Sequence, residues 1–125
     1  MLCTQTRFTV ASGGHHLPLC RRADGTFETL GASGTILGLL DAPRLSDTTA
    51  VLRQGDVTVL YTDGVTEARW SREFFDDDRL RAVIDRCVGL TAQETADAVV
   101  GAALDFQDGE ARDDMAVVVI GVRAG

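Results

Sequence analysis

The chain has 125 residues, which is the size of one domain rather than two. Its hydrophobic share of 45% is typical of a globular protein and excludes an intrinsically disordered one. Nineteen acidic residues against twelve basic ones give a formal charge of −7. This balance argues against nonspecific binding to nucleic acid or to an anionic membrane, because both need a basic face.

Nothing in the sequence predicts secretion or membrane insertion. The N-terminus lacks a basic region followed by a long apolar run, and no stretch approaches the roughly 20 apolar residues of a membrane span. The three cysteines, Cys3, Cys20 and Cys87, are far apart and form no zinc-binding pattern with the two histidines. The odd count predicts reduced thiols in a cytoplasmic protein.

The first third of the chain predicts β-strands. Residues 7–12 and 17–22 have strand character. The sequence Ala23-Asp24-Gly25 predicts a hairpin turn, with a return strand over residues 26–30. The glycine-rich residues 31–43 predict a loop.

Residues 48–63 predict the clearest hairpin, with a turn at Gln54-Gly55-Asp56. From Val57 onward, apolar and polar residues alternate as in a strand with one buried face. This strand ends on a lone carboxylate, Asp63, which is followed directly by Gly64.

The spacing of the apolar residues then changes to that of a helix. Leu80, Val83, Ile84 and Cys87 share one helical face, and three aspartates at 76–78 stand where the helix N-terminus favours negative charge. Gly89 is a suitable residue to end this helix.

A second helix is predicted to begin at Thr91, where Thr91 and Glu94 form a capping box. Its apolar stripe is Ala96, Val99, Val100 and Ala103. The nearly continuous apolar run of residues 115–122 then predicts a strand buried on both faces.

Two of the predicted strands carry carboxylates at one end. Asp63 follows the first, and Asp113 and Asp114 precede the last. If these strands pair antiparallel, the carboxylates meet at one edge of the sheet, where a hard divalent cation would relieve their repulsion. The alternatives are that Asp63-Gly64 is an ordinary turn and that Asp113-Asp114 lies in a solvated loop.

Four segments, read in order, resemble one known family. They are SGGHHLPL (12–19), LGLL (37–40), LRQGDVTVLYTDGVTEAR (52–69) and DDMAVVVI (113–120). The chain resembles the C-terminal part of the bacterial metal-dependent serine/threonine protein phosphatases related to stage II sporulation protein E, within the protein phosphatase 2C superfamily. The third segment, with Asp-Asp-Met following about fifty residues later, is the most specific.

The resemblance implies an α+β fold with mostly antiparallel sheets, part of a β-sandwich flanked by two adjacent helices. It also implies a site for two Mn²⁺ or Mg²⁺ ions, at which a water attacks the phosphorus of a phosphoserine or phosphothreonine. Asp63 and Asp113 match metal-binding aspartates, Gly64 matches the glycine of the metal loop, and Asp114 matches a neighbour that supports a ligand. No side chain of this chain is implied as a catalytic acid, base or nucleophile.

The chain also departs from the family pattern. It lacks the upstream G-D-x-x-D and D-V-x-G-H-G motifs, which supply the aspartate that bridges the two ions, and Ser12 and Leu17 replace a usual asparagine and proline. Residues 1–125 are therefore expected to be the C-terminal portion of a single phosphatase domain, inactive without the rest. The alternatives are a noncatalytic protein-binding module, a degenerate phosphatase that docks a signalling partner, and a structural fragment with no activity.

The partner that the resemblance implies is a phosphorylated regulatory protein, such as an anti-sigma-factor antagonist. Self-association is expected too. The other half of the domain would cover apolar faces and strand edges, and without it these surfaces are open to pairing with a second copy. Residues 57–62 and 117–122 are expected in one sheet. The carboxylates of Asp63 and Asp113 are expected within about 8 Å, the span that two ions about 3.5–4 Å apart require.

Overall fold

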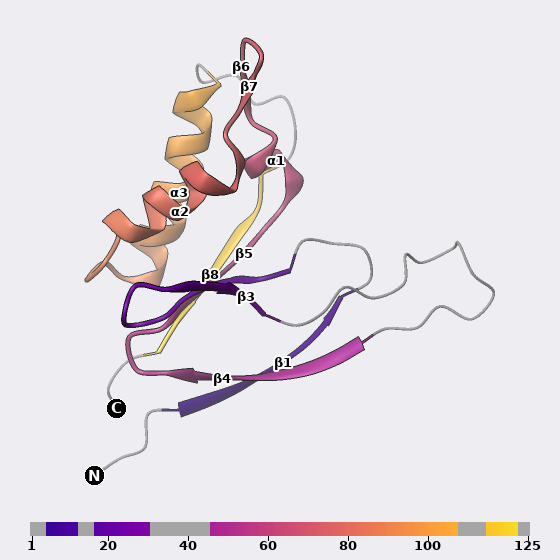
Figure 1. Cartoon of the computed structure of the whole chain (residues 1–125). Helices are drawn as coiled ribbons and strands as arrows, with labels where there is room; N and C mark the ends of the chain where they lie inside the picture. The colour runs from indigo at the N-terminus through magenta and orange to yellow at the C-terminus, as the bar shows by residue number, and fades with distance from the viewer. Residues whose placement is uncertain (1–4, 13–16, 31–45, 108–114, 123–125) are drawn as a thin grey trace, which may run out of the picture. The chain divides into compact units, whose positions relative to one another are not determined.

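Figure 1 shows the computed structural model of the chain. The structure describes residues 5–12, 17–30, 46–107 and 115–122. The chain divides into two compact units. Unit 1 comprises Met1–Thr58 and Gly121–Gly125, and unit 2 comprises Val59–Ile120.

The elements alternate between short strands and helices along the chain. The strands are β1 (Gln5–Ser12), β2 (Leu19–Arg21), β3 (Phe27–Thr29), β4 (Ser46–Arg53), β5 (Val57–Tyr61), β6 (Arg69–Trp70), β7 (Glu73–Phe74) and β8 (Val117–Gly121). The helices are α1 (Asp63–Thr66), α2 (Asp76–Arg86) and α3 (Ala92–Phe106). A turn after residue 62 was predicted, but its helical form in α1 and the β6–β7 hairpin were not predicted from the sequence.

The described strands form three sheets. β1 pairs with β4, β6 pairs with β7, and a four-stranded sheet has the order β3-β2-β5-β8. The pairings with a described register are antiparallel, which confirms the predicted α+β class with mostly antiparallel sheets. The prediction that residues 57–62 and 117–122 share a sheet is also confirmed, since β5 neighbours β8.

The hairpin predicted at Ala23-Asp24-Gly25 is confirmed. β2 and β3 pair antiparallel, with Cys20 opposite Glu28. The Gly25 N–H donates to the Arg22 carbonyl at 2.9 Å, and Gly25 has a φ of +93°. A tight turn followed by a left-handed glycine is a common three-residue hairpin loop, and glycine adopts that conformation without steric cost.

The prediction that β4 and β5 form a hairpin is wrong, because β4 pairs with β1 and β5 pairs with β2 and β8. The turn itself forms, with the Asp56 N–H donating to the Arg53 carbonyl at 2.9 Å. Gly55, its third residue, has a φ of +91°, the pattern of a type II turn. Type II turns splay the flanking strands, whereas hairpins favour the mirror-image types, so this turn leads from one sheet into another.

The prediction of a last strand buried on both faces is wrong for the described residues. β8 stands at the end of the strand order, and the Val118 side chain is 56% exposed. A continuous apolar run indicates what a strand is able to bury, but a neighbour must lie on each side before burial occurs.

Both predicted helices are present in unit 2. The predicted face of α2 is buried through Leu80, Val83 and Ile84. The capping box at the start of α3 forms: the Glu94 N–H donates to Thr91 Oγ1 at 3.1 Å, and the Thr91 N–H donates to Glu94 Oε1 at 3.0 Å. The buried stripe of α3 differs from the prediction, because its fully buried residues include Thr95.

Burial of Thr95 is tolerated because its hydroxyl donates a hydrogen bond to the Thr91 carbonyl at 2.9 Å. That bond satisfies the polar group inside the helix. The predicted residues Ala96 and Val100 are only half-buried.

Helices α2 and α3 contact each other, as predicted. Phe75 and Phe106 form an edge-to-face pair with ring centroids 5.8 Å apart. The guanidinium of Arg79 lies over the Phe106 ring, 4.6 Å from its centre. These contacts fix the start of α2 against the end of α3.

Candidate metal centre at the end of β5

The backbone holds Asp63 where β5 meets β8. The Thr62 N–H donates to the Ala116 carbonyl at 3.1 Å, and the Ala116 N–H donates to Thr62 Oγ1 at 3.0 Å. At the other end of the pair, the Gly55 N–H donates to the Val122 carbonyl at 3.1 Å. The two contacts run in opposite directions along the chain, so β5 and β8 are antiparallel and Asp63 follows β5 at the end where β8 begins.

Asp63 is the first residue of the single helical turn α1. Its carbonyl accepts the Glu67 N–H at 2.8 Å, and the Val65 N–H donates to the Thr62 carbonyl at 3.0 Å. Gly64, Val65 and Thr66 are buried, whereas Asp63 is exposed. The turn therefore buries the residues that follow Asp63 and leaves the Asp63 side chain exposed to solvent.

The Thr66 hydroxyl is buried and has no hydrogen-bond partner among the described residues. A buried hydroxyl normally has a partner, since leaving it unpaired costs about 1–3 kcal/mol. The Thr58 hydroxyl is in the same state, so the unpartnered Thr66 oxygen does not by itself mark a ligand site.

Tyr61 connects this strand end to α2. Its hydroxyl lies 3.4 Å from Asp77 Oδ1. Burial, followed by the negative charge and hydrogen bond of Asp77, raises the pKa of Tyr61 to about 12. The phenol therefore remains neutral across the physiological range.

The structure describes only some of the residues that the sequence predicted as metal ligands. Asp63 and Gly64 lie in α1 at the expected sheet edge, whereas Asp113 and Asp114 fall outside the described residues, and so does the predicted Asp63–Asp113 distance. Within residues 5–12, 17–30, 46–107 and 115–122, no three His, Cys, Asp or Glu side chains are grouped so as to hold a metal ion. The chemistry of the predicted donors nevertheless suits the predicted ions, because Mg²⁺ and Mn²⁺ prefer carboxylate oxygens.

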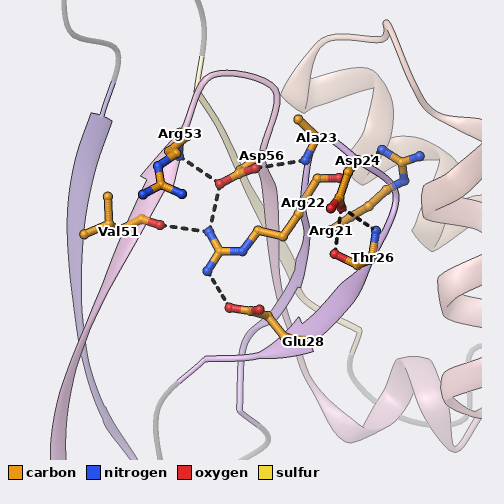
Figure 2. Close-up of polar contacts among 9 residues, drawn as sticks. All are labelled: Arg21, Arg22, Ala23, Asp24, Thr26, Glu28, Val51, Arg53 and Asp56. Carbon is orange, nitrogen blue, oxygen red and sulfur yellow. Dashed lines mark hydrogen bonds and ion pairs between the residues drawn. The ribbon is translucent and has the colours of Figure 1, made fainter.

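A second polar cluster lies in unit 1, at the other end of β5 (Figure 2). Asp56 is only 3% exposed and accepts three hydrogen bonds: from Arg22 Nη1 at 2.8 Å, the Arg53 N–H at 2.8 Å and the Ala23 N–H at 2.9 Å. The other arm of Arg22 forms an ion pair with Glu28. The cluster joins the β2–β3 hairpin to the turn between β4 and β5.

The electrostatics of this cluster favour its charged form. Burial acts to raise the pKa of Asp56, but the hydrogen bonds from Arg53, Arg22 and Ala23 outweigh burial and lower it. The hydrogen bonds to Glu28 and Asp56 raise the pKa of Arg22. Both carboxylate oxygens of Asp56 accept hydrogen bonds from the protein and the side chain is buried, so this aspartate holds the fold together.

The sequence analysis treated Asp56 only as a turn residue and missed this role. The signal was the placement of a carboxylate directly after Gly55, within a segment otherwise rich in apolar residues. A Cβ at Gly55 would lie 2.8 Å from Ala23 Cβ, so this glycine also permits the close approach of the two turns.

The model of the family described as Stage II sporulation protein E (SpoIIE) matches residues 3–123. The chain belongs to the SpoIIE family. Phosphoserine phosphatase RsbU of Bacillus subtilis (strain 168) is 32% identical to it over 115 residues, which cover 91% of this chain and 34% of RsbU. The resemblance drawn from the sequence is thereby confirmed.

Solved structures of the same fold are also similar to this SpoIIE-family chain. The manganese-presoaked phosphatase domain of SpoIIE from Bacillus subtilis has a TM-score of 0.72 at 21% identity, covering 97% of this chain and 52% of that one. The SiaA-PP2C domain of Pseudomonas aeruginosa has a TM-score of 0.71 at 20% identity, covering 94% and 46%. These likenesses confirm the PP2C-type fold.

The SpoIIE-family chain spans about a third of the length of RsbU and about half of these two phosphatase domains. None of the helices within the described ranges has the length and apolar character needed to cross a membrane.

Proposed function

We propose that the chain is the C-terminal portion of a metal-dependent protein phosphatase domain that hydrolyses phosphoserine or phosphothreonine in a regulatory protein. The observation that carries the proposal is the exposed carboxylate of Asp63 at the β5–β8 edge of a SpoIIE-family chain. Two Mn²⁺ or Mg²⁺ ions would neutralise charge on the phosphoryl oxygens and supply the nucleophilic water.

Asp63 and Asp113 are the proposed ligands, with Asp114 supporting one of them and Gly64 allowing the backbone to approach the ions. The pairing of Thr62 with Ala116 supports this assignment. Asp113 precedes Ala116 by three residues, and three residues of extended chain reach at most about 10–11 Å. That length is enough for the Asp113 carboxylate to reach Asp63, as the proposed shared site requires.

The residues of this chain would act by holding and positioning rather than by proton transfer. Asp63 binds through oxygen from a turn whose backbone is fixed to β5, and the buried Gly64, Val65 and Thr66 keep that turn in place. Tyr61 stays protonated next to Asp77, so it adds no charge to the strand end.

The substrate that we propose is a phosphorylated signalling protein of the anti-sigma-factor antagonist class. Its support is the similarity to RsbU, whose name describes a phosphoserine phosphatase. The alternative is a noncatalytic module that docks such a protein. The observation in its favour is that the chain spans only about half of the matched phosphatase domains.

One experiment separates these alternatives. It compares the 125-residue chain with an extended chain, defined here as the same residues preceded by the upstream half of the domain from the parent gene. We expect no hydrolysis of a phosphoserine peptide by the short chain in millimolar Mn²⁺, because the chain lacks the upstream aspartate that the family resemblance implies for holding the ions. We expect Mn²⁺-dependent hydrolysis by the extended chain.

Within the extended chain, Asp63→Asn should remove nearly all activity while sparing the fold, because it removes a ligand oxygen but no core volume. Asp105→Asn on the exposed side of α3 is the matched control and should keep full activity. Full activity of Asp63→Asn would refute the metal role. Turnover by the short chain that depends on Mn²⁺ and Asp63 would mean that the missing ligand comes from these residues or from a second copy.

A further inference from the structure

The β6–β7 hairpin, residues 69–74, exposes aromatic side chains that the proposed metal site does not use. Trp70 is 55% exposed and Phe74 is 49% exposed. The register places Arg69 opposite Phe74 and Trp70 opposite Glu73. Paired residues lie on the same face of a ribbon, so one aromatic ring stands on each face.

Among the described residues, the charged groups of this hairpin that have no ion-pair partner are positive. The Glu73 carboxylate is paired with Arg79 Nη2 at 3.0 Å. The side chains of Arg69 and Arg72 are exposed, and they make no hydrogen bond or ion pair within the described part of the chain. In a chain of formal charge −7, this hairpin thus carries two arginines that have no acidic partner among the described residues, beside two exposed aromatic rings.

The base of the hairpin is anchored while its tip is bare. The Phe75 N–H donates to the Ala68 carbonyl at 2.7 Å, and Arg79 Nη1 donates to the Phe74 carbonyl at 2.7 Å. The Ala68 N–H in turn donates to the Val65 carbonyl of α1 at 3.3 Å. These bonds tie the hairpin to the turn that carries Asp63.

The tip itself holds an unfavourable conformation. Ser71, the first of the two loop residues, has a φ of +57°, where glycine is usual. A non-glycine residue held there costs on the order of 1 kcal/mol, and such outliers are concentrated at functional sites.

We propose that the β6–β7 hairpin docks the phosphorylated protein substrate, with apolar side chains of that protein packing on Trp70 at one face of the ribbon and on Phe74 at the other, and with Arg69 and Arg72 pairing with its acidic groups. The proposal rests on the proposed phosphatase function for the identity of the occupant. Trp and Arg are enriched among the residues that dominate binding energy, and an anchored hairpin loses little freedom on binding. A phosphoprotein is anionic, so it needs local cations to approach a chain of this net charge.

The test uses a property of the sequence: Trp70 is the only tryptophan. The 125-residue chain is titrated with a tryptophan-free, phosphorylated anti-sigma-factor antagonist from the same genome, and the emission of Trp70 is followed. We expect a saturable blue shift, because an indole that is 55% exposed moves out of water. Arg69→Glu/Arg72→Glu and Phe74→Ser should each raise the apparent Kd about tenfold or more.

Two control variants keep the result specific. Arg53→Glu/Arg86→Glu changes the net charge by the same amount at exposed positions elsewhere, and Val88→Ser/Leu90→Ser removes exposed apolar groups between α2 and α3. Both should leave the Kd unchanged. The proposal is overturned by three results: no shift, an equal loss of affinity in the controls, or a blue shift that grows with the concentration of the chain alone.

The last of these results would mean that a second copy of the chain covers the hairpin. Since fluorescence needs no turnover, the docking and phosphatase proposals fail separately. A shift with an inactive extended chain would contradict only the phosphatase, and activity without a shift would contradict only the docking.

Discussion

Asp56 and Asp63 stand at opposite ends of the same strand, and each has a glycine beside it, yet their surroundings differ completely. Asp56 precedes β5, is 3% exposed and accepts hydrogen bonds from three donors of unit 1. Asp63 follows β5, begins α1 and is exposed. Residue type and a neighbouring glycine therefore do not distinguish a structural aspartate from one that is available for chemistry.

The difference comes from what each turn faces. The type II turn at Gly55 packs against Ala23 and directs the Asp56 carboxylate at two backbone N–H groups and a guanidinium. The turn at Gly64 is helical. The carbonyls of Thr62 and Asp63 accept hydrogen bonds from backbone N–H groups of this turn, and the Asp63 side chain is exposed to solvent. A buried carboxylate that accepts three hydrogen bonds from the protein stabilises the fold, whereas an exposed carboxylate at a strand end is accessible to a cation.

The largest effect on stability should follow from Asp56→Ala. The variant leaves the Arg22 guanidinium and two N–H groups without their partner, so the free energy of unfolding should fall by about 3 kcal/mol. Urea denaturation of both proteins measures the change. Asp63→Asn is the matched comparison and should stay within about 0.5 kcal/mol of wild type; equal losses in the two variants would erase the distinction between these aspartates.

Acid should remove the contribution of Asp56. The folded-state pKa of this carboxyl is lowered, so its contribution is present above the ordinary pKa of aspartate, about 3.9, and is lost as pH falls below that value through the folded pKa. The stability difference between wild type and Asp56→Ala should therefore be constant near neutral pH and shrink below about pH 4. A difference that is unchanged at pH 3 would contradict this assignment.

A third aspartate extends the comparison, with a smaller expected effect on stability. Asp76 starts α2 with a φ of +57°, and its Oδ1 accepts the N–H groups of Asp78 at 3.0 Å and Arg79 at 3.3 Å. Asp76→Ala loses the cap and keeps the strain, so it should destabilise by about 1–2 kcal/mol. Asp76→Gly loses the cap but relieves the strain, and thermal unfolding should place it between wild type and the alanine variant.

The smallest effect concerns Tyr61, the only tyrosine, whose titration is visible in the absorbance of the phenolate. Its pKa should lie near 12, and Asp77→Asn should lower it only in part, because burial is the larger cause. Stability should accordingly decline as pH rises from about 10, where the unfolded chain ionises, towards 12. Ionisation of the folded protein at the ordinary pKa near 10 would show that the ring is not held as described.

Most of the elements could be predicted because their signals are local. The Thr91–Glu94 box and the 3.6-residue spacing around Leu80 depend on neighbours a few residues away. The β5–β8 neighbourhood was expected because antiparallel pairing of these strands would bring the carboxylates at their ends together.

The errors arose where distant neighbours decide. Residues 48–63 have the pattern of a hairpin, but β4 pairs with β1 and not with β5. The burial of Asp56 depends on Arg22, a residue 34 positions away in the sequence. Val118 lies in an apolar run yet is exposed, because a strand is buried only where something covers it.

Manganese binding tests the central claim most directly. Titration of the extended chain with Mn²⁺, with free ion measured by electron paramagnetic resonance, should show two bound ions per domain. Asp63→Asn should lose at least one of them, whereas Asp105→Asn should bind as wild type does. If Asp63→Asn binds the same number of ions with the same affinity, Asp63 is not a metal ligand and the proposed site is wrong.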